Sequence, residues 1–98
     1  MGLNFIGDVG VYLPSRDAVK ITAIDGDRVI DCYATRSALE AVGCPGLAEG
    51  SELLRHFQKH RDNLELAAIV KYRRALTRPT AIEVEAADLA AILPASAA

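Results

Sequence analysis

The stretch AVKITAIDGDRVIDCYAT, residues 18–35, decides the fold, because hydrophobic and polar side chains alternate on both sides of Asp25-Gly26-Asp27. A repeat of two residues is typical of a β-strand that is buried on one face only. The Asp-Gly pair tolerates the positive φ that tight hairpin turns require. The stretch therefore predicts two antiparallel strands joined in a hairpin, with Ile30, Cys32 and Ala34 on the buried face of the second strand.

The segments on either side of the hairpin predict more strands and three helices. Additional strands are expected at VGVYLP (9–14) and AIEVEA (81–86), with LNF (3–5) as a short edge piece. The expected helices are ALEAVG after an N-cap at Ser37, one long helix from Glu52 to about Leu76 after an N-cap at Ser51, and a short C-terminal ADLAAIL (87–93).

These elements predict an α+β fold of two layers. We expect an antiparallel sheet of about three to five strands, with one long helix and two short helices packed on it. The chain has 98 residues, enough for one domain with a modest core. We place that domain at residues 1–93 and a flexible tail at residues 94–98.

The composition excludes several classes of protein. Hydrophobic residues make up 51% and charged residues 24% of the chain, which argues against intrinsic disorder. Two cysteines are too few for a disulfide framework, and no apolar run approaches the roughly 20 residues that cross a bilayer. The N-terminal segment lacks the pattern of a signal peptide, so the sequence predicts a cytoplasmic protein without a membrane association.

The long predicted helix has apolar residues on two sides. One broad stripe, which includes Phe57 and Tyr72, is expected to lie on the sheet, but Leu66, Ile69 and Val70 fall on the opposite side. A helix that is apolar on both sides is usually covered on both sides. The cover is either the C-terminal ADLAAIL helix or a second protein, and we predict a partner interface at Leu66, Ile69, Val70 and Arg73, in a homodimer or with an unknown protein partner.

The residues capable of catalysis or metal binding do not form a recognisable motif. His56 and His60 stand at positions i and i+4, but eleven residues separate Cys32 from Cys44, where zinc fingers have two to four between their cysteines. Phe57 stands where a zincin has its catalytic glutamate. A Cys44–His56 pair remains as a thiol-enzyme alternative. We predict no catalytic residue, no metal and no cofactor.

Basic residues concentrate between Ser51 and Arg78. This segment contains seven Lys or Arg residues and only three acidic residues, in a chain whose net charge is -2. This local excess suggests an alternative function, a small nucleic-acid-associated regulator. Its contact residues would be Arg55, Lys59, Arg73, Arg74 and Arg78. Hydrophobic residues interrupt this basic surface and no outward aromatic residue is available for base stacking, so nucleic acid is the less favoured partner.

Several segments together resemble a family of short bacterial proteins known as domain of unknown function 1488. The resemblance is carried by LNF near the start, by AVKITAIDGDRVIDCYATRSALEAVG, by LLRHFQKHRDNLELAAIVKYRR and by IEVEAADL. In the third segment, Phe57, His60, Arg61 and Tyr72 stand at the family's usual places. The resemblance implies a small α+β fold and no established activity. The first segment, IGDVGVYLPS, departs from the family pattern. The function that we expect is a non-enzymatic protein-interaction module.

Overall fold

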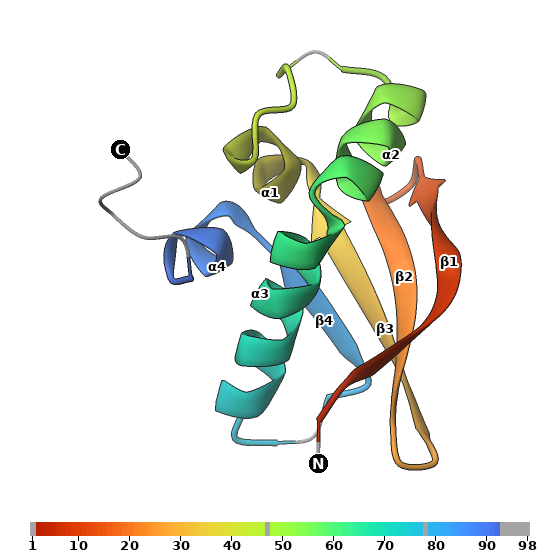
Figure 1. Cartoon of the computed structure of the whole chain (residues 1–98), viewed down its shortest axis with the longest axis vertical. Helices are drawn as coiled ribbons and strands as arrows, with labels where there is room; N and C mark the ends of the chain where they lie inside the picture. The colour runs from red at the N-terminus through yellow and green to blue at the C-terminus, as the bar shows by residue number, and fades with distance from the viewer. Residues whose placement is uncertain (1, 47, 78, 93–98) are drawn as a thin grey trace.

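A four-stranded sheet forms one layer of the protein, and helices packed on one of its faces form the other (Figure 1). The computed structural model describes residues 2–46, 48–77 and 79–92. Their strands are β1 (Asn4–Leu13), β2 (Ala18–Asp25), β3 (Arg28–Thr35) and β4 (Ala81–Val84), and their helices are α1 (Arg36–Ala41), α2 (Gly50–Lys59), α3 (Arg61–Arg74) and α4 (Ala86–Ala90). The predicted two-layer α+β class is confirmed.

The central hairpin forms where the alternation predicts it. β2 and β3 pair antiparallel over their whole length, and Asp25 faces Arg28 across a two-residue turn. Gly26 in that turn has a φ of +66°, a value that glycine adopts without steric cost. The inward residues of both strands are buried, among them Ile30, Cys32 and Ala34.

The first strand is longer than the sequence indicates. β1 begins at Asn4, so the expected short edge piece and the expected strand at residues 9–14 form one element. Its pairing with β2 shifts register between Ile6 and Val11. Such an irregularity interrupts the strict alternation of side chains, which explains why the pattern suggested two pieces.

The fourth strand corrects the prediction of an antiparallel sheet. β4 lies beside β3 and runs parallel to it, with Cys32 opposite Ile82 and Ala34 opposite Val84. The chain between these strands crosses the sheet through α1, α2 and α3 and returns in the same direction, as a parallel pair requires. The alternation over the four residues of β4 predicts which face of the strand is buried, but it does not predict whether the strand runs parallel or antiparallel to its neighbour.

The single long helix from Glu52 to about Leu76 is also wrong. The chain forms α2 and α3 instead, and they separate at His60, whose φ of -114° and ψ of 24° are not helical. A straight helix of that predicted length would span roughly 37 Å, whereas an eight-residue strand covers roughly 26 Å. The break allows α2 to pack on β1 and β2 while α3 packs on β4.

The helix termini also differ from the sequence-based expectation. Thr35 caps α1 with its side chain, and Glu49 precedes α2 without a side-chain cap, so neither Ser37 nor Ser51 is the N-cap residue. The short C-terminal helix is present as α4, and its Leu89 is fully buried in the same core as Phe57, Leu53 and Ile30. In the described part of the chain, no helix is long and apolar enough to span a membrane.

Candidate functional site

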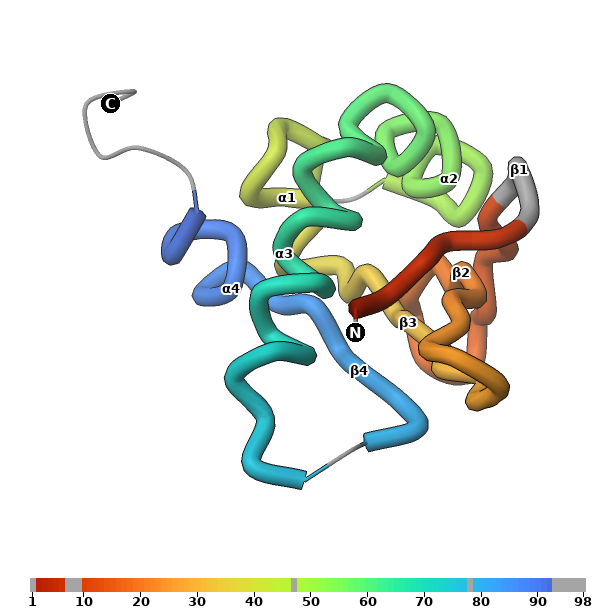
Figure 2. The backbone as a smooth tube through the Cα atoms, turned by 60° about the horizontal axis from the view of Figure 1, so that its bottom comes forward, coloured from red at the N-terminus to blue at the C-terminus, as the bar shows by residue number. Residues whose placement is uncertain are grey.

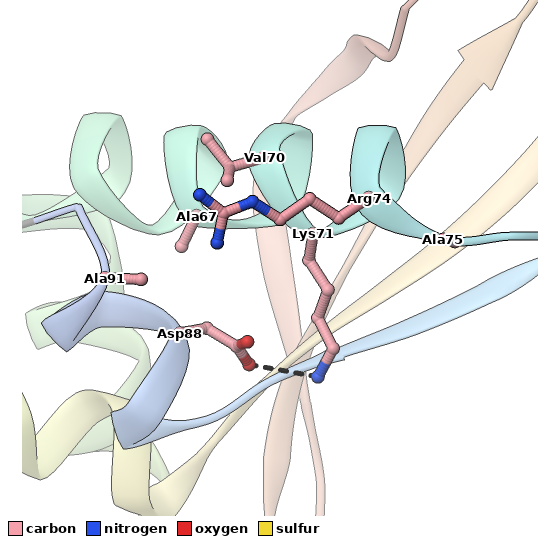
Figure 3. A pocket seen from close by; sticks show the side chains of 7 residues that line it. All are labelled: Ala67, Val70, Lys71, Arg74, Ala75, Asp88 and Ala91. Carbon is pink, nitrogen blue, oxygen red and sulfur yellow. Dashed lines mark hydrogen bonds and ion pairs between the residues drawn. The ribbon is translucent and has the colours of Figure 1, made fainter.

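A groove lies between the C-terminal half of α3 and the short helix α4 (Figure 3). Its volume is about 360 Å³, and it is lined by Ala67, Val70, Lys71, Arg74, Ala75, Asp88 and Ala91. The residues from α3 stand three, four and seven positions after Ala67, a spacing that places side chains on one side of a helix. The alanines keep the groove open because their side chains do not fill the space between the two helices.

An ion pair fixes the relative position of α3 and α4 along this groove. Lys71 Nζ lies 3.0 Å from Asp88 Oδ2 and also donates to the main-chain carbonyl of Glu83, at 2.5 Å. The same Asp88 oxygen accepts from the backbone N–H of Glu85, at 2.8 Å, as part of the capping box of α4. Lys71 therefore connects α3 with the start of α4 and with the edge strand β4.

Arg74 provides the charge that the groove does not neutralise. Its side chain runs back along α3, so that the guanidinium lies near Val70 and Ala67 (Figure 3). Arg74 is exposed and forms no ion pair with another residue that the structure describes. The groove thus combines an apolar lining with one available cation.

The four residues of the predicted partner interface lie in different environments. Leu66 is 46% exposed, and Arg73 is exposed at the end of α3. Ile69 is partly buried and packs against the core, while Val70 is partly buried and lines the groove beside α4. The C-terminal helix therefore flanks part of this surface. The participation of these residues in a homodimer or another complex stays a prediction.

The residues of the nucleic-acid alternative do not form one continuous stripe. Because the helix breaks at His60, Arg55 and Lys59 lie on α2, whereas Arg73 and Arg74 lie on α3. Arg55 and Lys59 line a small pocket of about 100 Å³ together with His56. The fifth residue of that set, Arg78, lies outside the described residues.

The histidines and cysteines lie in surroundings that do not favour thiol chemistry. Burial, followed by the charges of Asp31 and Glu65, raises the pKa of the Cys32 thiol to about 12. Burial also raises the pKa of Cys44, so both thiols are protonated at neutral pH. Among the described residues, no hydrogen bond joins Cys44 to His56, and no group of three or more His, Cys, Asp or Glu could hold a metal.

The two histidines are neighbours even though α2 ends just before His60. The rings of His56 and His60 are nearly parallel, with centroids 6.4 Å apart. His56 Nδ1 is buried and has no hydrogen-bond partner in the part of the chain that the structure describes. The spacing of four residues correctly predicts that the rings lie on one side, but a third ligand for a metal is missing among the described side chains.

Sequence reasoning missed most of the groove. The sequence pattern assigns Arg74 to a nucleic-acid surface and Val70 to a partner interface, but it does not assign the other lining residues to a site. The positions of Asp88 and Ala91 depend on where α4 docks. One signal in the sequence was the opposite charge of Lys71 and Asp88. It predicts a contact only if α3 and α4 are already known to be neighbours.

Comparisons with known proteins agree with this fold. Residues 3–88 match the family described as "Protein of unknown function (DUF1488)". The crystal structure of a protein of unknown function from the DUF1488 family of Shewanella loihica PV-4 is similar over 85% of this chain and 91% of that chain, with a TM-score of 0.66 and 23% sequence identity. No curated protein matches the sequence. Because the family match covers most of the chain, this protein belongs to the DUF1488 family.

Proposed function

We propose that the protein is a non-enzymatic interaction module that binds an acidic, partly apolar segment of another protein in the groove between α3 and α4. One observation carries the proposal: Arg74 lines this largely apolar groove and has no carboxylate partner among the described residues. A partner segment with one apolar side chain and one carboxylate would match both features.

The size and chemistry of the groove support this kind of ligand. A volume of about 360 Å³ is large enough for one or two side chains of a peptide. An arginine–carboxylate contact is shorter and stronger than a neutral hydrogen bond, particularly beside an apolar surface. Lys71 already has Asp88 as its partner, so Arg74 is the cation that remains for the ligand.

The sequence-predicted interface extends this surface. Leu66, Val70 and Arg73 stand at positions i, i+4 and i+7 of one helix, a spacing that places them along one side. Val70 lines the groove, so the exposed Leu66 and Arg73 would contact a partner segment longer than the groove itself. The partly buried Ile69 would support this surface from below.

Binding of a designed peptide tests the proposal. The ligand is a fluorescein-labelled amphipathic peptide with leucines on one face and glutamates beside them, and its partner peptide has glutamine in place of glutamate. We expect the acidic peptide to bind more tightly than the neutral one. Arg74→Glu should weaken binding of the acidic peptide about tenfold or more, the cost of a charge-assisted hydrogen bond.

Arg55→Glu is the matched control, because it makes the same change of charge at an exposed position on α2, away from the groove. The control should bind the acidic peptide nearly as well as the unmodified protein. Equal losses in Arg55→Glu and Arg74→Glu would indicate non-specific attraction and would contradict the proposal. Equal affinity for the acidic and the neutral peptide would also contradict it. Far-UV circular dichroism verifies that both variants are folded.

The second candidate function is a small nucleic-acid-associated regulator. It is supported by Arg55, Lys59, Arg73 and Arg74, which are all exposed. The break at His60 works against it, because it places these cations on two helices. Fluorescence anisotropy with labelled single-stranded DNA separates the two functions: nucleic-acid binding would weaken steeply as salt rises, and no binding at low salt would exclude it.

A further inference from the structure

The face of the sheet opposite the helices is not covered by α1, α2 or α3 (Figures 1 and 2). Residues that pair across neighbouring strands point to the same face of a sheet. The pairing of Ile6 with Thr22, of Val11 with Lys20 and of Ile24 with Val29 therefore places these six residues on one face. They alternate with the buried residues that the helices cover, so this is the outer face of the sheet.

This outer face bears several exposed hydrophobic residues. In the described part of the chain, five large hydrophobic residues are exposed, and three of them lie here. Ile6 is 46%, Val11 57% and Val29 58% exposed. Ile24 lies opposite Val29 and is partly buried. An apolar surface of several neighbouring strands is typical of a face that contacts another protein.

The charged residues on the same face neutralise one another. Lys20 Nζ lies 3.6 Å from Asp31 Oδ1, and the Arg16 guanidinium lies 2.9 Å from Glu83 Oε2. Arg16 also covers the ring of Tyr33, with its guanidinium carbon 3.9 Å from the ring centroid. The charges of these four described residues therefore sum to zero, although the chain carries a net charge of -2.

We propose that this face binds the same face of a second copy of the chain. Two sheets would then pack on each other, with the helices of both copies on the outside. A neutral face does not attract a strongly charged partner by electrostatics. Two identical neutral faces, by contrast, do not repel each other when they come into contact. A two-fold axis through the face would place the apolar residues of one copy against those of the other.

The available area is sufficient for a reversible dimer. The four strands average about eight residues in length, so at about 3.3 Å per residue and about 4.8 Å between strands they cover roughly 500 Å². Two such faces would bury about 1,000 Å², the lower limit for a specific interface. The dimer should therefore dissociate on dilution. The groove lies on α3 and α4 and not on the outer face of the sheet. A result that contradicts dimerisation would therefore leave the proposed peptide binding unaffected, and the reverse also holds.

Sedimentation equilibrium of the full chain tests the proposal. We expect a monomer–dimer equilibrium whose dissociation constant rises at least about tenfold in Val29→Lys and in Ile6→Lys, because each change places two buried ammonium groups near the two-fold axis. Leu66→Lys is the matched control: Leu66 and Ile6 are both 46% exposed, but Leu66 lies on α3. It should leave the dissociation constant unchanged.

Two outcomes would overturn the proposal. One is a monomer at high micromolar concentration of the unmodified chain. The other is dissociation by Leu66→Lys with no effect of Ile6→Lys and Val29→Lys, which would place the interface on the helical side. Circular dichroism of the three variants verifies the fold, and the use of two separate positions on the sheet keeps the test valid if one variant fails to fold. Peptide binding in the groove is unaffected by either outcome and is measured separately.

Discussion

At the scale of single residues, Asp17 connects the end of β1 with the start of α1. Its carboxylate accepts from Tyr12 Oη at 2.7 Å and from two nitrogens of Arg36, at 2.6 and 3.0 Å. Arg36 in turn donates to the carbonyls of Gly46 and Ala48. Asp17 has a φ of +51°, a conformation that Asp and Asn tolerate better than most residues. The end of β1, the following turn and the loop before α2 thus depend on one carboxylate.

The charge of Asp17 should make stability dependent on pH. Hydrogen bonds, first from Arg36 and then from Tyr12, hold the pKa of this carboxyl below its ordinary value. A lowered pKa in the folded state stabilises the protein above the unfolded pKa of about 3.9, and this stabilisation is lost as the pH falls through the folded pKa. Asp17→Asn should therefore reduce the free energy of unfolding at pH 7 but make progressively less difference below about pH 4.

The size of that effect is limited by solvent. The Asp17 side chain is 44% exposed, so we expect a loss of about 1 kcal/mol or less at pH 7. Urea unfolding of both proteins at a series of pH values measures it. Asparagine retains the tolerance for positive φ, which isolates the contribution of the charge. A difference that stays constant from pH 7 to pH 3 would show that the charge has no role.

At the scale of elements, the start of α1 is bonded to the C-terminal part of the sheet. Thr35 Oγ1 accepts from the backbone N–H of Ala38 and donates to the carbonyl of Val84, at 2.8 Å. Ser37 Oγ lies 3.1 Å from Thr35 Oγ1 and accepts from the backbone N–H of Ala86. The Thr35 hydroxyl therefore caps α1, and the hydroxyls of Thr35 and Ser37 together connect this helix to the β4–α4 junction.

Substitution of the two hydroxyl residues should distinguish the actual cap from the one that the sequence suggested. Thr35→Ala removes both a helix cap and a hydrogen bond to β4, and we expect it to cost about 1–2 kcal/mol of stability. Ser37→Ala should cost less, because Ser37 is exposed and its hydrogen bond can be replaced by water. Thr35→Ser is the control that keeps the hydroxyl. Urea unfolding measures the loss of stability in each variant. A larger loss in Ser37→Ala than in Thr35→Ala would indicate that Ser37, and not Thr35, is the N-cap residue of α1.

Individual helices and strands also differ in how well the sequence predicts them. The β2–β3 hairpin was predictable because its alternation and its Asp-Gly turn are local signals. The break at His60 was not, because neither Gly nor Pro marks it and the break depends on the dimensions of the sheet beneath. The parallel direction of β4 and the docking of α4, and with them the candidate groove, depend on contacts between distant segments.

At the scale of the whole molecule, a buried polar cluster joins the tip of the central hairpin to the last turn of α3. Tyr72 Oη donates to Asp25 Oδ2 at 2.6 Å and accepts from Arg28 at 3.1 Å. Arg28 also donates to the carbonyl of Pro79, in the segment between α3 and β4. Both Asp25 and Tyr72 are buried. The cluster fixes the end of α3 that bears Arg74, so the position of the candidate groove depends on the hairpin tip.

A double-mutant cycle at Asp25 and Tyr72 measures how strongly these distant parts are coupled. Tyr72→Phe leaves a buried carboxylate without this hydrogen bond and should cost about 1–3 kcal/mol of unfolding free energy. Asp25→Asn retains the shape and one acceptor oxygen. The double variant should lose less than the sum of the two single losses, with a coupling of at least about 0.5 kcal/mol in urea unfolding. Additive losses would mean that the hairpin tip and α3 are stabilised independently, and that the orientation of Arg74 beside the groove does not depend on the hydrogen bond between Tyr72 and Asp25.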